Sequence, residues 1–201
     1  MKVPIEEVLR RTGEFFMGQS PVHRSANKIA RALTEMKIPF AIAGALAANA
    51  HGHRRTTDDV DLLMTREGLA RFKSEWLGRG WVEKFQGSKG LRDPETDVKI
   101  DVLLTGEYPG DGKPKPVVFP DPTAAAEMGS DGTPVLRLAV LLELKLASGM
   151  TSPNRLKDLA DVMALIVANK LPREYSSSLN EYVRAKFDEL WVAAQEPERE
   201  F

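Results

Sequence analysis

The sequence lacks cysteine altogether, and none of its apolar runs reaches the roughly 20 residues that a membrane-spanning helix needs. The first absence excludes disulfides, thiolate metal sites and cysteine nucleophiles. The second argues against a spanning segment, and the charged N-terminal stretch MKVPIEEVLRR leaves no apolar core for a secretory signal. We therefore expect a soluble, cytoplasmic protein with no membrane partner.

An excess of charge of one sign is also absent, because 28 basic residues face 29 acidic ones and the formal net charge is -1. Such a chain has no global field that would draw it onto nucleic acid, so any site for a polyanion must be local. Hydrophobic residues make up 42% of the 201 residues, which is enough for one compact domain or for a core with a smaller helical partner.

The order of periodic segments predicts alternating helices and strands, followed by helices alone. Strands are expected at 40–43, 60–64, 81–85, 97–104 and 117–119, and helices at 25–37, 46–50, 66–77, 136–148, 155–168 and 177–194. Ser25 is the expected N-cap of the first helix. A boundary near Gly132 separates a core of residues 1–132 from a C-terminal helical subdomain of residues 133–201. The fold class is therefore expected to be mixed α/β (α+β).

The segment DVDLLM at residues 59–64 is typical of a strand on which two aspartates share one face. Residues two apart on a strand point the same way, so Asp59 and Asp61 project together, roughly 7 Å apart, while the apolar residues enter the core. Carboxylates this close repel each other unless a cation lies between them, and their hard oxygens suit Mg²⁺ or Mn²⁺. The pattern predicts a metal site at Asp59 and Asp61.

A third carboxylate is expected from strand 97–104, whose sequence DVKIDVLL alternates polar and apolar residues. Asp101 lies on its polar face, and pairing of this strand with the first would bring Asp101 beside Asp59 and Asp61. Three carboxylates can hold two metal ions in the arrangement that serves in-line phosphoryl or nucleotidyl transfer. The three aspartates are therefore the predicted catalytic and metal-binding residues.

The segment before the first two aspartates predicts a phosphate site. Gly44 falls between a strand and a helix, where a glycine lets backbone N–H groups approach a phosphate and the helix N-terminus favours an anion. The loop HGHRRTT then supplies Arg54 and Arg55 for further phosphate contacts. His51 and His53 have the spacing of a metal pair, but because no third ligand is nearby we expect exposed loop residues or phosphate contacts.

Gly44-Ala45, thirteen further residues and Asp59-Val60-Asp61 together resemble the signature of the nucleotidyltransferase superfamily, in which a third aspartate lies on a later strand. Within that superfamily the chain is most similar to the AbiEii-type toxins and related minimal nucleotidyltransferases. The resemblance runs from residue 38 to residue 166. It includes matching positions in the loop and in the C-terminal helices: Gly52, Arg55, Thr57, Lys145, Lys157, Asp158 and Asp161.

The resemblance implies a nucleotidyltransferase-type mixed β-sheet flanked by helices, and an enzyme that moves a nucleoside monophosphate from an NTP to an acceptor hydroxyl. In such an enzyme the three aspartates hold Mg²⁺ and activate the acceptor. Lys145 is expected to point into the active cleft, and Asp158 or Asp161 to position Lys145 or the nucleotide. The implied nucleotide-binding residues are Gly44, Ala45, Arg55, Thr57, Lys145, Asp158 and Asp161.

Three functions stay open at this point. The toxin-like relatives imply an acceptor that is an RNA end such as tRNA or a protein side chain, and an antitoxin partner. Local basic residues at 54, 55, 84, 89 and 92 favour RNA, whereas the near-neutral charge does not. Modification of a small molecule, as in antibiotic nucleotidyltransferases, is permitted by the composition. Ala45 stands where the superfamily usually has glycine or serine and offers a backbone contact without a hydroxyl. That departure keeps a catalytically silent nucleotide-binding module as the third alternative.

Overall fold

The structure is a computed structural model that describes residues 3–196. Its helices are α1 (Ile5–Phe16), α2 (Pro21–Glu35), α3 (Gly44–Ala50), α4 (Arg66–Trp76), α5 (Pro122–Ala125), α6 (Leu138–Thr151), α7 (Leu156–Ala168) and α8 (Glu181–Gln195), with 3-10 turns η1 (Pro153–Arg155) and η2 (Arg173–Ser178). Its strands are β1 (Phe40–Ile42), β2 (Asp59–Met64), β3 (Val82–Glu83), β4 (Leu91–Arg92), β5 (Lys99–Leu104), β6 (Ala126–Met128) and β7 (Pro134–Leu136).

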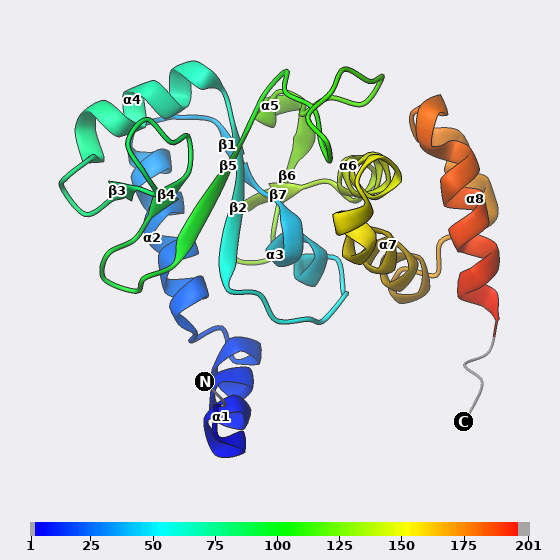
Figure 1. The fold of residues 1–201 in the computed structure, drawn as a ribbon, viewed down its shortest axis with the longest axis horizontal. Coiled ribbons are helices and arrows are strands. Elements are labelled where there is room, and N and C mark those ends of the chain that lie inside the picture. The colour runs from blue at the N-terminus through cyan, green and yellow to red at the C-terminus, as the bar shows by residue number, and fades with distance from the viewer. Residues whose placement is uncertain (1–2, 197–201) are drawn as a thin grey trace.

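The strands of the described chain form one mixed sheet in the order β3-β4-β5-β2-β1-β7-β6. Strand β2 pairs in parallel with β5 and antiparallel with β1, and β7 adds in parallel to the other edge of β1. Helices flank this sheet (Figure 1). The mixed α/β fold expected from the sequence is confirmed.

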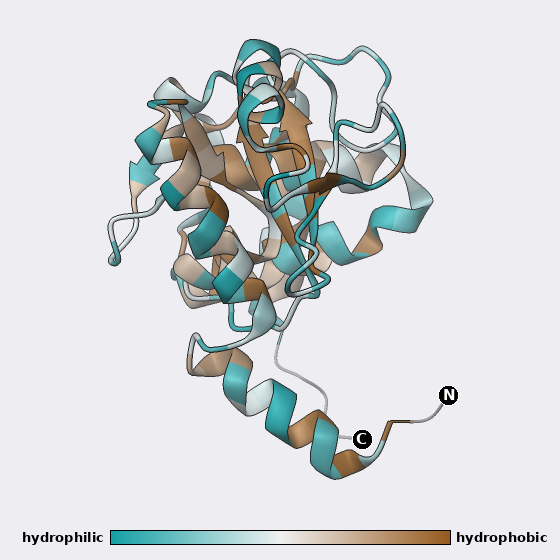
Figure 2. Ribbon diagram, turned by 90° about the vertical axis from the view of Figure 1, so that its left-hand side faces the viewer, coloured by the Kyte–Doolittle hydropathy of each residue, from teal (hydrophilic) through white to brown (hydrophobic). Residues whose placement is uncertain are grey.

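The two faces of the sheet bury two separate apolar clusters. Val60, Leu62 and Ile100 face the cluster that includes residues of α2 and α4. Leu63 faces the other cluster, to which α3, α6, α7 and α8 contribute. Because side chains alternate along a strand, Asp59, Asp61 and Leu63 share the second face. The strands stand out as apolar in Figure 2, where α1 extends away from the main body of the molecule. No helix within residues 3–196 combines the length and apolarity that crossing a bilayer requires.

The second helix of the chain begins earlier than the sequence indicated. Ser20 caps α2 by accepting a hydrogen bond from the backbone N–H of His23, and Pro21 occupies the first helical position. Ser25 lies inside the helix and is completely buried, with its hydroxyl donating to Asp93 at 2.9 Å. The expected N-cap at Ser25 is therefore wrong, because its hydroxyl makes a long-range contact.

Two segments in the second half of the chain differ from expectation. Residues 117–119 form no strand, but Val117 and Phe119 are buried, and Phe119 exchanges backbone hydrogen bonds of 2.8 Å with residues 106 and 107. Leu136 ends β7 instead of starting a helix, and β7 reaches β1 through Val135. The boundary expected near residue 132 falls between β6 and β7, which pair with each other in the sheet.

Candidate functional site

The three aspartates meet on one face of two neighbouring strands. The parallel register of β2 and β5 places Asp61 directly beside Asp101, and Asp59 lies one pleat away on β2. The alternate residues of both strands are buried on the opposite face, so the apolar pattern fixes the direction of the carboxylates. The structure thus brings together the carboxylates that the sequence predicted to lie together.

Gly44 allows the Asp61 carboxylate to lie against the start of α3. Its backbone φ is +57°, a left-handed conformation that glycine adopts without cost. A Cβ atom at this position would overlap an Asp61 carboxylate oxygen and lie only 2.6 Å from Cγ of Asp61. Ala45, the next residue, is buried within α3 and has no positive φ. The left-handed conformation is therefore needed at Gly44 alone, and alanine at position 45 is unstrained.

Burial and like charge act together on Asp61. Desolvation, followed by repulsion from the Asp59 and Asp101 carboxylates, raises the pKa of Asp61 from 3.8 to about 6, against the opposing effect of Lys145 and Lys157. A nearby positive charge would stabilise the ionised carboxylate of Asp61. The electrostatics of the site thus favour a cation.

The other two carboxylates have partners. The hydroxyl of Thr57 donates to Oδ1 of Asp59 at 2.6 Å, so this threonine orients a carboxylate of the cluster. Lys84, which directly follows β3, forms an ion pair with Oδ1 of Asp101. Thr57 and Asp59 also line a cavity of about 750 Å³. Lys84 has a place beside the cluster that the sequence did not indicate.

Lys145 on α6 is the centre of a buried ion network. Its side chain is part of the cavity wall but only 5% exposed, and its ammonium lies 2.6 Å from Asp161 and 3.1 Å from Asp158. Ser148 donates to the second oxygen of Asp158 at 2.7 Å. Asp161 does not line the cavity, but its ion pair with Lys145 holds the ammonium in place.

Arg55 links this network to the loop that carries the aspartates. Its guanidinium donates to Oδ2 of Asp161 at 2.9 Å, and its Nε lies 2.8 Å from Oδ1, close enough for an ion pair but not aligned as a hydrogen bond. His53 Nε2 lies 3.2 Å from the same carboxylate. Burial would raise the pKa of Asp161, but Lys145 and Arg55 outweigh it and lower this pKa below its ordinary value. His53 is therefore a network residue, which its spacing to His51 did not indicate.

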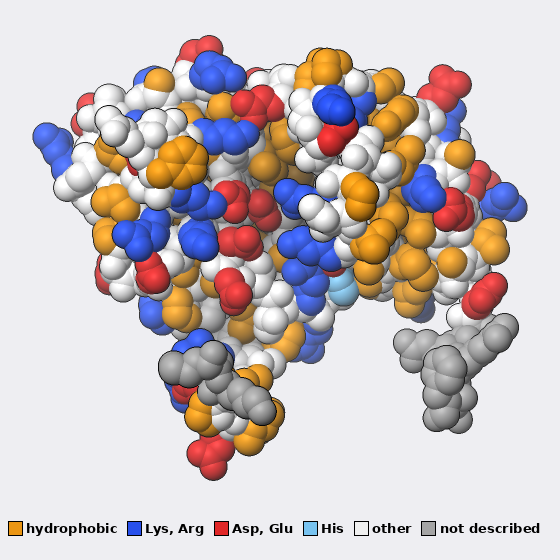
Figure 3. Space-filling view, in the orientation of Figure 1, with side chains coloured by type: hydrophobic (Ala, Val, Ile, Leu, Met, Phe, Trp, Pro, Cys, Tyr) orange, Lys and Arg blue, Asp and Glu red, His pale blue; other side chains and the backbone are white. Residues whose placement is uncertain are grey.

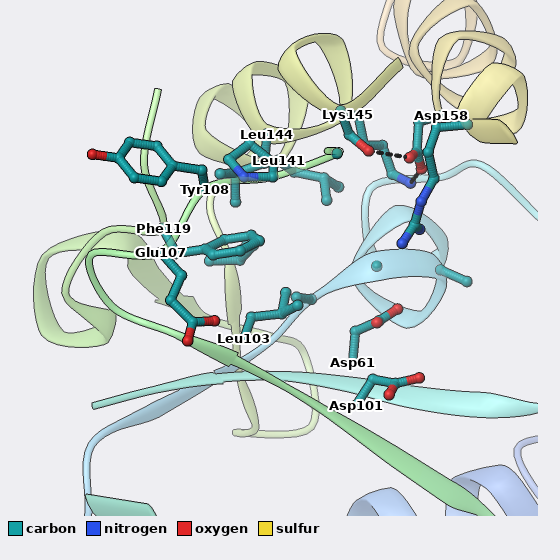
Figure 4. Close-up of a pocket in the computed structure, with 18 of the residues that line it drawn as sticks. Asp61, Asp101, Leu103, Glu107, Tyr108, Phe119, Leu141, Leu144, Lys145 and Asp158 are labelled. Atoms are coloured by element: carbon teal, nitrogen blue, oxygen red, sulfur yellow. Dashed lines mark hydrogen bonds and ion pairs between the residues drawn. The ribbon is translucent and has the colours of Figure 1, made fainter. Parts of the chain in front are cut away.

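A cavity of about 750 Å³ contains the cluster, within the range of small-molecule sites. Acidic and basic side chains gather in the hollow at the centre of the face shown in Figure 3. Asp61 and Asp101 lie at one end, below Lys145 and Asp158 (Figure 4). The other end is largely apolar and includes Leu103, Tyr108, Phe119, Leu141 and Leu144, with the carboxylate of Glu107 beside them. The cavity combines a charged end with an apolar end.

The apolar end was not predicted from the sequence. It is built partly from the proline- and glycine-rich stretch after β5, where the sequence indicates an irregular loop with at most a short strand. The apolar pattern at residues 117–119 was the available signal, although it indicated a strand. Phe119 instead packs as part of the cavity wall in irregular backbone.

The donor set suits a magnesium ion that arrives with its substrate. Within residues 3–196 no group of three or more acidic or histidine side chains is arranged to hold a metal ion unaided. Mg²⁺ in nucleotide sites is commonly bound by one or two carboxylates together with phosphates and water. Asp59 and Asp61 supply two such carboxylates beside Gly44, so the residues fit a metal bound with a triphosphate.

Comparisons with known proteins identify the fold. No family model matches the chain, and no curated protein matches it. Among solved structures it is similar to the antibiotic-resistance factor ANT(2'')-Ia in solution, with a TM-score of 0.50, 16% identity, and coverage of 83% of this chain and 89% of that chain. The same factor in complex with adenylyl-2''-tobramycin gives a TM-score of 0.50 and 17% identity, with 84% of this chain and 94% of that chain covered.

A third solved structure agrees with these two. It is a candidate nucleotidyltransferase from Thermotoga maritima, with a TM-score of 0.50 and 18% identity over 68% of this chain and 89% of that chain. At identities this low the likeness concerns the arrangement of the backbone. The chain has the fold of the nucleotidyltransferases.

Proposed function

We propose that this chain is a metal-dependent nucleotidyltransferase that moves a nucleoside monophosphate from an NTP to an acceptor hydroxyl. The observation that carries the proposal is the register of β2 and β5, which sets Asp61 beside Asp101 with Asp59 on the same face. Gly44, whose missing Cβ leaves room for the Asp61 carboxylate, lines the same cavity together with Ala45, so their backbone N–H groups lie near the place proposed for the triphosphate.

The residues divide into those that hold the nucleotide and those that act on the acceptor. Asp59 and Asp61 would hold Mg²⁺, which when bound neutralises the triphosphate and stabilises the charge that develops during transfer. The backbone amides of Gly44 and Ala45, which line the cavity at the start of α3, would donate to the phosphates. Lys145 adds a positive charge in the cavity wall, held in place by its two carboxylates.

Transfer requires one bond to form and one to break at the α-phosphorus. The acceptor oxygen attacks that phosphorus, and the bond to the pyrophosphate oxygen breaks. The hydroxyl proton passes to Asp101, whose Oδ1 faces Lys84 while its Oδ2 is left to accept it. Arg155 and Lys157 also line the cavity, and their charges suit the departing pyrophosphate.

The ion pairs favour a small hydroxylated acceptor over RNA. The five basic residues that the sequence offered for RNA have partners in the structure: Arg55 with Asp161, Lys84 with Asp101, Lys89 with Glu107, Arg92 with Asp97, and Arg54 over the Phe16 ring. Paired cations contribute little to a phosphate footprint. The adduct bound to ANT(2'')-Ia, a nucleotide joined to tobramycin, also supports a small-molecule acceptor.

The test is transfer of label from each of the four NTPs, labelled at the α-phosphate, in Mg²⁺. Acceptors are a panel of hydroxylated small molecules that includes aminoglycosides, and separately total tRNA. Label on a small molecule, with pyrophosphate released in equal amount and none formed by the Asp59→Asn, Asp61→Asn variant, supports the proposal. Transfer by that variant at the wild-type rate contradicts it.

The same assay separates the remaining functions. Label on RNA in place of a small molecule would identify the toxin-like activity, for which an antitoxin partner is then expected. Metal-dependent NTP binding without turnover on any acceptor would identify a silent nucleotide-binding module.

A further inference from the structure

Lys84 is placed beside the catalytic cluster by a tightly fitted hairpin. It directly follows β3, and its backbone N–H donates to the carbonyl of Gly90 at 3.1 Å. Its aliphatic stem passes over Gly90, where a Cβ atom would lie 2.8 Å from Cδ and 3.3 Å from Cε of the lysine. The glycine thus leaves the space through which the lysine reaches Asp101.

Neighbouring contacts hold this hairpin against the sheet. Lys73 donates to Glu83 at 2.6 Å, and the other oxygen of Glu83 accepts the backbone N–H of Gly87 at 2.7 Å. Lys89 forms an ion pair with Glu107 in the stretch that follows β5. The Lys84 side chain is 22% exposed, less than a free surface lysine would be. The geometry therefore fixes the ammonium near Asp101.

The position of Lys84 affects the charge balance of the three aspartates. Within the described residues, Lys84 is the one cation in direct ion contact with Asp59, Asp61 or Asp101. The charge of Lys145 is already matched by the two carboxylates of its own network. A cluster of three carboxylates can hold two metal ions, but here one carboxylate oxygen of Asp101 is taken by an ammonium.

We propose that Lys84 is an internal cation of the active site, which substitutes for one of two metal ions. The site then takes one divalent cation, held by Asp59 and Asp61 together with the nucleotide, and Asp101 serves as the proton acceptor and not as a metal ligand. This inference rests on the proposed function and specifies how its site is charged. Lys84 acts through Asp101, so it is a positioning residue.

The test counts bound metal ions. Mn²⁺ is titrated into the protein in the presence of the non-transferable α,β-methylene analogue of each of the four NTPs, with free Mn²⁺ followed by electron paramagnetic resonance. Wild type is expected to bind one Mn²⁺ per bound analogue, and Lys84→Met and Lys84→Gln two, because Asp101 is released to join the metal site. Lys84→Arg retains the charge and is expected to keep one.

Matched controls make the outcome decisive. Lys89→Met removes another lysine of the same hairpin, one that pairs with Glu107, and is expected to leave the count at one. Two ions in wild type, or one ion in both neutral Lys84 variants that still bind the analogue, would overturn the inference and leave the proposed function standing. Failure of wild type to bind Mn²⁺ and every analogue would overturn the proposed function, and this inference with it.

Discussion

At the scale of single residues, Gly44 and Asp61 form one unit in which each constrains the other. The glycine must be left-handed and must lack a side chain, because the carboxylate fills the space beside its Cα atom. The sequence predicted a backbone role for Gly44 from its place between strand and helix. Its contact with Asp61 could not be predicted, because it depends on how β2 and α3 pack.

Gly44→Ala is expected to reduce stability by about 2–4 kcal/mol, since a positive φ and a steric overlap are combined. Urea denaturation measures this loss. Gly18→Ala is the matched control, because Gly18 also has a positive φ of +71° but no atom within 4 Å of the added carbon. The control should lose only about 1 kcal/mol, from the backbone conformation alone. Equal losses would show that Asp61 does not occupy the space.

The raised pKa of Asp61 predicts a pH dependence of stability. Because the folded pKa of about 6 lies above the ordinary 3.8, the folded state favours the protonated form. The stability that protonated Asp61 contributes to the folded state is present below pH 4, and it is lost as the pH rises through 6. Asparagine does not titrate, so Asp61→Asn removes this loss. In a chelator, the free energy of unfolding of the variant should rise relative to that of wild type by about 1–3 kcal/mol between pH 4 and 7. A gain that stays constant across this range contradicts the assignment.

At the scale of elements, the helices α6 and α7 are joined by the ion network around Lys145. Removal of one member of a buried ion pair leaves the other charge without compensation. This network also reaches the loop before β2 through Arg55, and so connects the helical part of the chain to the strand that carries the aspartates. Its side chains matched a sequence pattern, but their mutual contacts depend on packing between residues that are distant in sequence.

Lys145→Met is therefore expected to reduce stability by about 3 kcal/mol, since Asp158 and Asp161 stay buried beside an apolar chain. Thermal and urea unfolding give the value. The control is Lys186→Met on α8, whose partner Glu189 has a side chain that is 64% exposed; this variant should change stability by less than about 0.5 kcal/mol. If the two variants lose the same amount, the network does not stabilise the α6–α7 contact.

Local sequence signals were sufficient for the elements that carry the site and insufficient for others. The strands at β1, β2 and β5 follow from buried runs and strict alternation. The strand β7 was not predicted, because its three residues pair with distant β1 and run directly into an apolar helix. In such a short apolar run, periodicity does not separate the end of a strand from the start of a helix. Pairing with the distant strand β1 is what makes residues 134–136 a strand.

At the scale of the whole molecule, charge is balanced overall and paired locally. The net charge is -1, and several cations around the cavity, Arg55, Lys84 and Lys89, are paired with carboxylates. The protein therefore presents a concave site for a compact ligand instead of an extended basic surface. This is the physical basis for expecting a small acceptor, which composition alone could not decide.

The expected consequence is weak attachment to RNA. At physiological salt the affinity for tRNA should be no tighter than non-specific binding, with a dissociation constant of about 10⁻⁴ M or weaker. Fluorescence anisotropy with labelled tRNA, repeated at several salt concentrations, measures the affinity and its salt slope. Submicromolar binding with a steep salt slope would show that the protein has an RNA-binding surface, and RNA would then be the favoured acceptor.

In the proposed function, Asp59 and Asp61 bind a nucleoside triphosphate through a divalent cation beside Gly44. The most direct measurement is calorimetric titration of the purified protein with each NTP, with Mg²⁺ and with chelator, beside the Asp59→Asn, Asp61→Asn variant. We expect binding of at least one NTP that requires both Mg²⁺ and the two carboxylates. Binding that is equally strong in chelator, or equally strong in the variant, would contradict it.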